Sequence, residues 1–444
     1  MLPEVTLPAS PAVLPGALRP CFSAPSFRTF CGLAAGLAGQ VRRRTVTGML
    51  PGAGLSRCWP HDRAHHFFAR ARRDIDELGL AVARLAVLLL VPAGAALTVA
   101  AGDTLFRRRG RRVCGAGWQH DGSSPSPGRT GFGTCFVTCE IVVYLPFLIR
   151  PGCRPVPARP VLPGAKASGG RAGKNGATKT GTAVALLTVP AGAFPGRPLH
   201  VVAGAAYHGP ALKDLPATVT WTCRLPANAV LDALAAPRRA GPGRPARTGK
   251  RPGTPAGLAR SADWARGTVP AHGRRQDTAL AAITCLWYGC TGTRTIRAVL
   301  AKGGRSTLLA PLTTGRHARP AALVTRYAAR WSSEQAFAGA RNTPGAGEAR
   351  TRVRRAVERT VPFALLTCTL VITWYARNGH CGQAIAARRA SEPWYRSKAA
   401  PAFEDMLTAL RRALITARIS EGSQAEPTPQ QTRAVLAAWH AAAA

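Results

Sequence analysis

The chain has 444 residues and a formal net charge of +40, because 60 lysines and arginines face only 20 aspartates and glutamates. This length allows two or three domains, each with its own core. The charge excludes an acidic surface that would bind cationic partners, and it indicates a basic surface that attracts polyanions. Nucleic acid is therefore the expected partner. A GC-rich coding background gives similar arginine, alanine and glycine usage, but such a background supplies acidic residues as well, and these are scarce here.

The twelve cysteines show no metal-binding signature, since no CxxC pair occurs. Residues 1–16 contain several prolines and lack a basic n-region, so they do not resemble a secretory signal, and we expect reduced thiols. Residues 78–91 form the most apolar run of the first half, but they are too few to cross a membrane and include Arg84. We expect a cytoplasmic, nucleoid-associated protein with no membrane partner.

Residues 27–91 show the pattern of short helices separated by glycine and proline. Basic residues, including Arg42, Arg43 and Arg44, fall on their polar sides. Such an arrangement suits a compact DNA-binding bundle, and an ordinary helical domain with solvated arginines fits the pattern equally well. We predict a helical DNA-binding head over residues 1–92.

After residue 92 the pattern changes to short, β-branched segments bounded by turns. Strands are predicted at residues 97–103, 135–145, 199–204 and 218–225, and again at 280–289, 294–302 and 306–314. Residues 150–181 are rich in proline, glycine and basic residues and predict a loose loop, and residues 236–257 predict disorder. Helices return from about residue 319. This order predicts an α/β core over 93–225 and 319–380, a basic loop and strand-rich insertion over 226–318, and a helical tail over 381–444.

Residues 326–341 carry the sharpest pattern. On one continuous helix, Tyr327, Arg330, Glu334 and Arg341 fall on a narrow polar stripe. By spacing alone, an exposed face with an i,i+4 ion pair between Arg330 and Glu334 is an equally good interpretation. Only ten glutamates occur in the chain, and this one lies among basic and aromatic residues just after the predicted core. We therefore take Glu334 as a candidate functional acid.

This stretch resembles the glutamate helix of DDE-type insertion-sequence transposases, which have an RNase H-like core. Their helix carries a tyrosine–arginine–glutamate–lysine signature at these intervals, and Arg341 stands here in place of the lysine. The resemblance covers nearly the whole chain. The actinobacterial branch of the family is similar to further stretches, which are LRPCFSAPSFRTFCGL, WPHDRAHHFFARAR, DTLFRRRGRRV, GWQHDGS, AVERTVPFALL and WYARNGH.

The resemblance implies a protein that binds double-stranded DNA, both transposon ends and target, and forms a homodimer in the DNA complex. It also implies Mg²⁺ or Mn²⁺, because three carboxylates from two strand ends and a helix hold two ions for phosphoryl transfer. Tyr327, Arg330 and Arg341 would hold the DNA backbone near the scissile bond. The three arginines at 42–44 and those between 107 and 112 are further candidates for backbone contacts.

Two of the three implied acids are missing. The first belongs where Gly102 stands, and the second belongs at Gly204, where the strand at 199–204 ends. Asp103 adjoins the first position but could serve only through a local shift, because neighbouring strand residues face opposite sides. Asp103 and Glu334 are therefore the remaining candidates for catalysis and metal binding, and we expect Asp103, Gly204 and Glu334 to come together in the fold.

Four possibilities remain open at this stage. One is a transposase with impaired catalysis that still binds transposon ends, which we favour. Another is a competent enzyme whose missing acids are supplied by Asp103 and an unforeseen neighbour, although Asp121 and Glu140 have no clear geometric claim. The others are a non-catalytic DNA-binding protein and a decayed gene product that folds poorly. The end sequence, the target preference and the oligomeric state leave no recognisable pattern.

Overall fold

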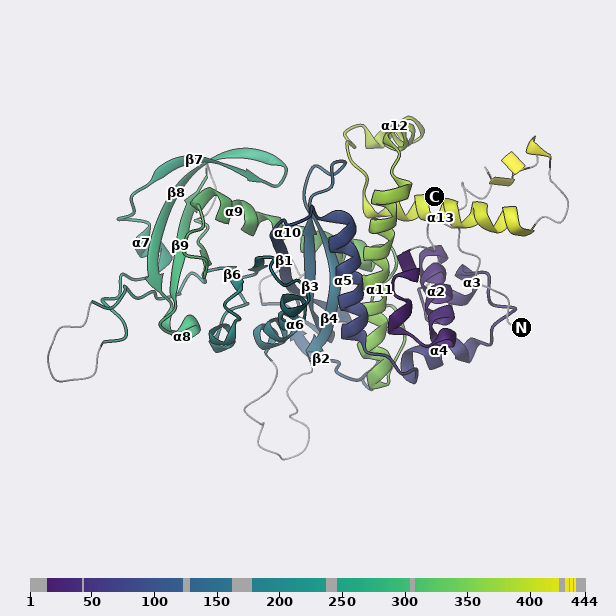
Figure 1. Cartoon of the computed structure of the whole chain (residues 1–444), viewed down its shortest axis with the longest axis horizontal. Helices are drawn as coiled ribbons and strands as arrows, with labels where there is room; N and C mark the ends of the chain where they lie inside the picture. Colours follow the sequence, from purple (N-terminus) through teal and green to yellow (C-terminus); the bar gives the residue numbers. More distant parts are fainter. Residues whose placement is uncertain are drawn as a thin grey trace, which may run out of the picture.

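The computed structural model of the chain describes residues 14–41, 44–122, 128–161, 178–236, 246–303 and 308–422, together with 428–430, 432–433 and 435–436. Within this part the fold is elongated, with a block of helices at one end, a sheet covered by helices in the middle, and a curved extension of that sheet at the other end (Figure 1).

One sheet runs through the described part of the chain in the order β2-β3-β1-β5-β6-β10-β9-β8-β7, and β4 pairs with β3 beside β2. The strands are β1 (Leu97–Arg107), β2 (Gly117–His120), β3 (Thr130–Val143), β4 (Gly152–Val161), β5 (Leu199–Ala203), β6 (Val219–Arg224), β7 (Ala265–Ala271), β8 (Arg274–Leu286), β9 (Thr295–Lys302) and β10 (Pro311–Thr313). Each predicted strand has a counterpart in this sheet, and β2, β4 and β7 are additions. Of the strand predicted at 306–314, only 311–313 form β10, and 306–307 lie outside the described residues.

Five of these strands define the core by their order and direction. β3 is antiparallel to both β1 and β4, while β5 is parallel to both β1 and β6. The connection from β4 to β5 contains helix α6 (Lys179–Ala193), as a crossover to a parallel strand requires. The order β4-β3-β1-β5-β6 is that of an RNase H-like sheet, which confirms the predicted α/β fold class.

Strand β4 corrects the prediction of a loose loop over residues 150–181. It contains Pro155, Pro157 and Pro160 and still pairs with β3 along its length. Among the described residues β4 pairs with β3 alone, so it is an edge strand. Proline has no N–H to donate, and an edge strand tolerates this because one of its sides has no neighbouring strand to bond. Residues 162–177 of the predicted loop lie outside the described residues.

The disorder predicted over 236–257 is wrong for its second half. Ala233 N donates to Lys250 O at 2.8 Å, and Leu231 N donates to Gly253 O at 3.2 Å, so the backbone at 250–253 is hydrogen-bonded to the segment at 231–233. The short helix α7 (Pro255–Leu258) follows, with the Thr254 side chain accepting from Gly257 N at its start. Residues 237–245 lie outside the described part.

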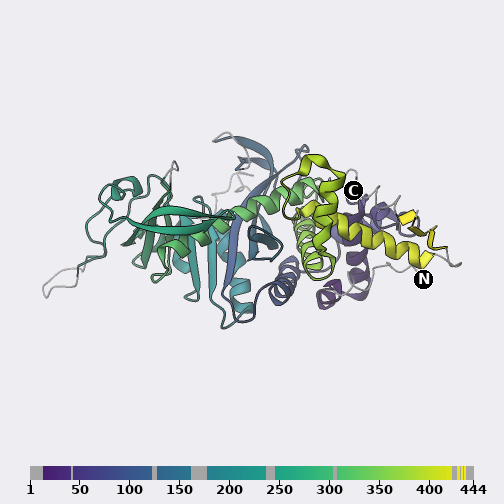
Figure 2. The same ribbon diagram turned by 90° about the horizontal axis from the view of Figure 1, so that it is seen from above.

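The two faces of the core sheet carry different helices. α9 (Pro320–Ala329) and α10 (Trp331–Asn342) cover one face, where Ala100, Val142 and Val202 pack with Ala329. Figure 2 shows these two helices following one another as a nearly straight rod across the strands. α5 (Ile75–Leu90) and α6 cover the other face, and α5 approaches β4 so closely that a Cβ on Gly79 would lie 3.2 Å from Val156 O.

Helix α11 (Arg354–Trp374) joins the sheet to the helical block, and nearly all of its residues are buried. Phe363 packs edge-on against Phe30, Phe67 and Phe68, and Arg359 donates from Nη1 to Phe68 O at 3.2 Å. With the turn that follows, residues 354–379 are long and apolar enough to cross a membrane, but 89% of the most apolar window is buried inside the fold. Burial inside the protein accounts for the apolar character of α11.

The remaining elements complete the helical regions. They are η1 (Arg19–Cys21), α2 (Ala24–Gly39), α3 (Met49–Gly52), α4 (His61–Ala69), η2 (Pro210–Asp214), α8 (Tyr288–Thr291), η3 (Tyr375–Gly379), α12 (Gly382–Ser391), η4 (Pro393–Tyr395) and α13 (Phe403–Gly422). The C-terminal region is helical, as predicted. α5, which the predicted boundary at residue 92 assigns to the head, packs on the core sheet instead, and the division into domains stays a prediction.

Candidate active site

Gly102 and Gly204 lie side by side under α9 and α10. The parallel register of β1 and β5 pairs Ala101 with Ala203, so the residues that follow them, Gly102 and Gly204, are neighbours. A Cβ on Gly102 would lie 3.4 Å from Phe337 Cε2, and a Cβ on Gly204 would lie 3.9 Å from Arg330 Nη1. Both glycines therefore face the helices that carry the candidate acid Glu334.

The helix predicted over residues 326–341 is two helices that meet at Arg330. Arg330 N donates to Tyr327 O at 3.1 Å, and Ser333 N donates to Arg330 O at 2.9 Å. These i→i+3 hydrogen bonds tighten the backbone at the junction. Arg330 is consequently placed between the two helices, with its side chain directed toward the end of β5.

Arg330 and Glu334 form the charged centre of this region. Arg330 Nη1 donates to Glu334 Oε1 at 3.1 Å, and the Glu334 side chain is 39% exposed. Burial lowers the pKa of the guanidinium, but the neighbouring Tyr327 and Glu334 outweigh it and raise that pKa. The structure thus brings Tyr327, Arg330 and Glu334 together beside Gly204, and the arginine keeps its charge.

Arg341 and Arg44 lie elsewhere. Arg341 is at the far end of α10, where it lines a separate cavity together with Arg44. Arg44 N donates to Glu348 Oε2 at 3.2 Å, and its guanidinium lies 3.6 Å from Glu348 Oε1. Arg42 and Arg43 lie outside the described residues, and the DNA-binding roles of all these arginines stay predictions.

Asp103 faces the opposite side of the sheet from Gly102. Its Oδ2 accepts from Lys179 Nζ of α6 at 2.5 Å and from Cys135 Sγ at 3.4 Å, and its Oδ1 accepts from the Tyr207 hydroxyl at 2.9 Å. The alternation of side chains along β1 is the reason, since Gly102 already takes the face toward α10. The expected convergence of Asp103 with Glu334 is therefore not found, and the catalytic and metal-binding role of Asp103 stays a prediction.

Glu140 is the acid that the structure does place on the α10 face. It lies on β3 opposite Ala100 and is fully buried. Thr138 Oγ1 donates to Glu140 Oε1 at 2.9 Å, while Oε2 has no hydrogen-bond partner within the described part of the chain. Burial raises the pKa of Glu140 to about 7, although Ser333 and Thr138 act to lower it. The sequence shows a single acid within an apolar strand, which was a signal for Glu140. It does not show the strand register, which directs this side chain toward α10.

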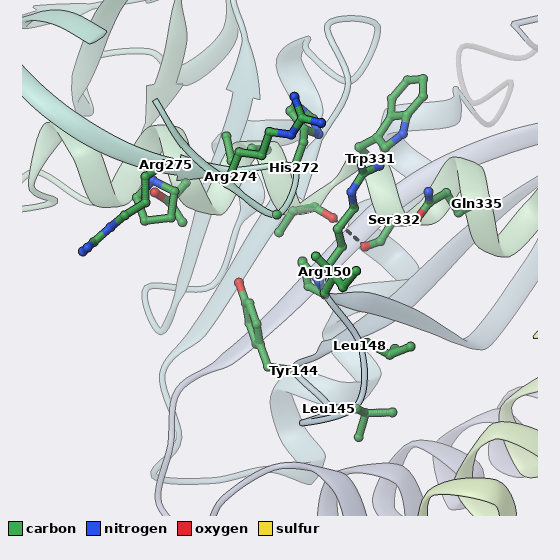
Figure 3. Close-up of a pocket in the computed structure, with 18 residues that line it drawn as sticks. Tyr144, Leu145, Leu148, Arg150, His272, Arg274, Arg275, Trp331, Ser332 and Gln335 are labelled. Carbon is green, nitrogen blue, oxygen red and sulfur yellow. Dashed lines mark hydrogen bonds between the residues drawn. The ribbon is translucent and has the colours of Figure 1, made fainter. Parts of the chain in front are cut away.

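A cavity of about 330 Å³ lies along a neighbouring flank of α10. It is bounded by Tyr144 and Arg150 after β3, by the β7–β8 turn around His272 and Arg274, and by Trp331. Figure 3 shows Arg150, Arg274 and His272 gathered near the Trp331 end of this cavity. Glu334 is not part of its wall, so this cavity adjoins the charged centre without containing it.

The residues present do not fit a divalent metal ion. Across the ranges that the structure describes, no three histidine, cysteine, aspartate or glutamate side chains are placed to hold a metal together. Mg²⁺ needs oxygen ligands, with one or more carboxylates among them, and Gly102 and Gly204 supply no side-chain oxygen. The remaining carboxylate, Glu334, is already paired with the Arg330 guanidinium, whose charge repels a cation.

An RNase H-like sheet with an acid-bearing helix over the ends of β1 and β5 defines a class of nucleic-acid-processing proteins. The family model described as DDE superfamily endonuclease matches residues 17–293 of the chain, which is more than half of it, and the chain belongs to that family. The match includes Gly102, Asp103 and Gly204 and ends before α9, so it does not include Glu334.

Among solved structures, the chain is similar to the piggyBac transposase in its cryo-EM synaptic complex with hairpin DNA. That alignment has 11% sequence identity and a TM-score of 0.42, and it covers 97% of this chain and 80% of the transposase chain. No curated protein matches the sequence.

Proposed function

We propose that this member of the DDE superfamily is a transposase-type protein of the insertion-sequence kind that binds transposon-end DNA and is impaired in cutting it. The observation that carries the proposal is the pair Gly102 and Gly204, side by side under Arg330 and Glu334. These are the two positions at which the resemblance to insertion-sequence transposases implies aspartates.

The impairment follows from the chemistry of the family. DDE endonucleases use divalent metal ions, which activate the attacking oxygen and stabilise the leaving one. Here one acid of the implied three, Glu334, remains on the α10 face at a partly exposed position, and it is paired with Arg330. Loss of one member of a catalytic unit commonly lowers the rate on the order of 10⁴-fold or more.

DNA binding is supported by charge and by the chemistry of arginine. The net charge of +40 favours a polyanion, and guanidinium groups hold phosphate oxygens in pairs. Arg330, next to Tyr327 and Glu334, would contact the backbone at the charged centre, and Arg341 would contact it further along α10. These four residues make up the proposed signature, with Arg341 at the lysine position. We further propose the actinobacterial type of the family, a homodimer on DNA, a nucleoid location, and Mg²⁺ or Mn²⁺ as the ion of an active copy.

Glu140 bears on the rival proposal of a competent enzyme. It is the one other acid that the described structure directs toward α10 from the strands beside Gly102. Because Glu140 is fully buried, it cannot reach a phosphate or a solvated ion without opening the packing around Ser333. Within the described part of the chain, neither Glu140 nor Asp103 is thus an accessible replacement acid at this centre, which supports an impaired enzyme over a competent one.

The proposal is tested with purified protein and duplexes carrying the inverted repeats that flank the gene. Binding is measured in EDTA over a range of salt, and cleavage is measured with Mg²⁺ and with Mn²⁺. We expect tight binding whose log affinity falls with log salt at a slope of about −6 or steeper, as release of many counterions requires. We expect no detectable cleavage. A slope nearer −1, or robust cleavage that Glu334→Ala abolishes, would overturn the proposal, and a chain that is not folded would support the decayed gene product.

A further inference from the structure

A second strongly basic feature lies at the other end of α10 from Glu334. Three segments far apart in sequence, at 44–45, 105–113 and 341–352, meet around a cavity of about 940 Å³, which we name the arginine groove. Its wall contains seven arginines, namely Arg44, the three at 107–109, Arg341, Arg350 and Arg352, and a single acid, Glu348.

The charge of the groove is largely uncompensated. Glu348 pairs with Arg44, and Asp121, outside the wall, pairs with Arg107 at 2.8 Å. Within the described residues, Arg108, Arg109, Arg350 and Arg352 pair with no carboxylate, and the last three of these are exposed. Like charges at this density repel one another, so the arrangement is stabilised by an anion that enters the groove.

Arg108 fixes one wall of the groove. It is 9% exposed, and its Nη1 donates to Gly347 O at 2.7 Å and to Ala349 O at 2.9 Å. Its Nε and Nη2 are buried and have no hydrogen-bond partner in the described structure. Arg108 therefore holds the backbone of Gly347 and Ala349 against the end of β1 and adds its positive charge from within the wall.

Two glycines hold the loop of this wall against the core. Gly345 and Gly347 have φ of +67° and +90°, which favours glycine. A Cβ on Gly345 would lie 2.6 Å from Arg44, and one on Gly347 would lie 2.5 Å from Phe106. The loop between α10 and α11 thus packs directly on Arg44 and on the end of β1, so the groove is preformed.

We propose that the arginine groove binds the phosphate backbone of duplex DNA and delivers the strand toward the Glu334 end of α10. This deepens the proposed function, and it rests on that function for the identity of the partner. Arg341 follows Glu334 by seven residues, which is about 10 Å along a helix axis. A backbone that lies in the groove therefore continues past Arg341 to Arg330. The volume exceeds what one phosphate needs, which favours a polymer of phosphates over a single anion.

The test compares two double variants with the same charge change. Arg109→Gln with Arg350→Gln removes two exposed groove arginines, and Arg224→Gln with Arg266→Gln removes two exposed arginines on β6 and β7. Fluorescence anisotropy with a labelled duplex in EDTA gives the affinity and its salt dependence. Each lost phosphate contact lowers the magnitude of the log–log salt slope by about one. We expect the groove variant to bind at least tenfold more weakly with a slope smaller by about two, and the control variant to stay within about twofold of the parent protein.

The outcomes separate this inference from the proposed function. A parent protein that does not bind duplex DNA overturns both. A parent that binds DNA, with groove and control variants that lose affinity equally, overturns the groove alone. Tighter binding of an RNA duplex of the same sequence overturns the choice of DNA. Circular dichroism and thermal unfolding of both variants confirm that they are folded, and Arg109→Lys with Arg350→Lys should retain most of the slope because it retains the charge.

Discussion

Arg330 Nη1 lies 3.1 Å from Glu334 Oε1, and it would lie 3.9 Å from a Cβ atom on Gly204. The guanidinium therefore occupies the region between the helix acid and the end of β5. In a DDE active site this region would be bounded by carboxylates that attract cations. Here it carries a fixed positive charge, so the centre is suited to hold a phosphate oxygen.

The two glycines should respond differently to aspartate. Gly204→Asp meets only Arg330, at 3.9 Å from the new Cβ, and gains an ion-pair partner there. Gly102→Asp adds a carboxyl beside Phe337, on the face that already buries Glu140. We expect Gly204→Asp to change the free energy of unfolding by less than about 1 kcal/mol and Gly102→Asp to lower it by roughly 1–3 kcal/mol. Urea unfolding of both variants measures this, and equal losses would contradict the described facing of the two strands.

Restoring both acids should restore cutting. The double variant Gly102→Asp with Gly204→Asp rebuilds a set of carboxylates with Glu334, and we expect metal-dependent nicking of end-bearing duplexes that the parent protein lacks. Gly204→Asp alone should recover at most a part of it, since Asp103 faces α6. A matched control is the double variant with asparagine at both positions, which adds similar volume without charge. A folded, DNA-binding double aspartate variant that stays inactive would mean that the damage lies elsewhere.

The comparison of sequence with structure separates what is local from what is not. The strands at 97–107 and 199–203 were predictable because β-branched and apolar residues fill them, and the alternation that separates Gly102 from Asp103 is a property of any strand. The partners of Asp103 were not predictable, since Lys179, Cys135 and Tyr207 come from three other segments.

The failures have equally physical causes. Strand β4 was missed because prolines normally exclude a strand, and only the sheet order shows that it lies at an edge. The break at Arg330 was missed because helical residues flank it on both sides and its backbone remains in the right-handed helical region. Helical periodicity placed Tyr327, Arg330 and Glu334 together, as the structure does, while the structure puts Arg341 further along α10 on the wall of a separate cavity.

Asp103 should behave as a structural acid. Asp103→Asn weakens its contacts with Lys179 and Tyr207 in a site where the aspartate side chain is only 17% exposed. We expect a loss of roughly 1–3 kcal/mol in the free energy of unfolding, because a partly buried ammonium loses its carboxylate. A double-mutant cycle with Lys179→Met should show a favourable coupling energy, and DNA binding should stay unchanged. If Mn²⁺ stabilises the parent protein against unfolding and Asp103→Asn abolishes that effect, Asp103 is a metal ligand and this prediction is wrong.

Glu140 should make the stability of the protein depend on pH near neutrality. Burial raises its pKa in the folded state to about 7, above the value of 4.5 for an unperturbed glutamate. The folded state therefore holds a proton that the unfolded state has lost between these two values. The contribution of Glu140 to stability is fully present below about pH 4.5 and is lost as the pH rises through about 7, a change on the order of 3 kcal/mol.

The variant Glu140→Gln removes this titration while keeping the hydrogen-bonding shape of the side chain. We expect the free energy of unfolding of the variant, relative to the parent protein, to rise by roughly 2–3 kcal/mol between pH 5 and pH 8. Urea unfolding at several pH values measures the difference, so that every other titrating group cancels. Glu404→Gln, at an exposed position on α13, is the matched control and should show no such trend. A difference between Glu140→Gln and the parent that stays flat with pH would show that Glu140 is ionised alike in both states, and that the packing of α10 over β3 admits water.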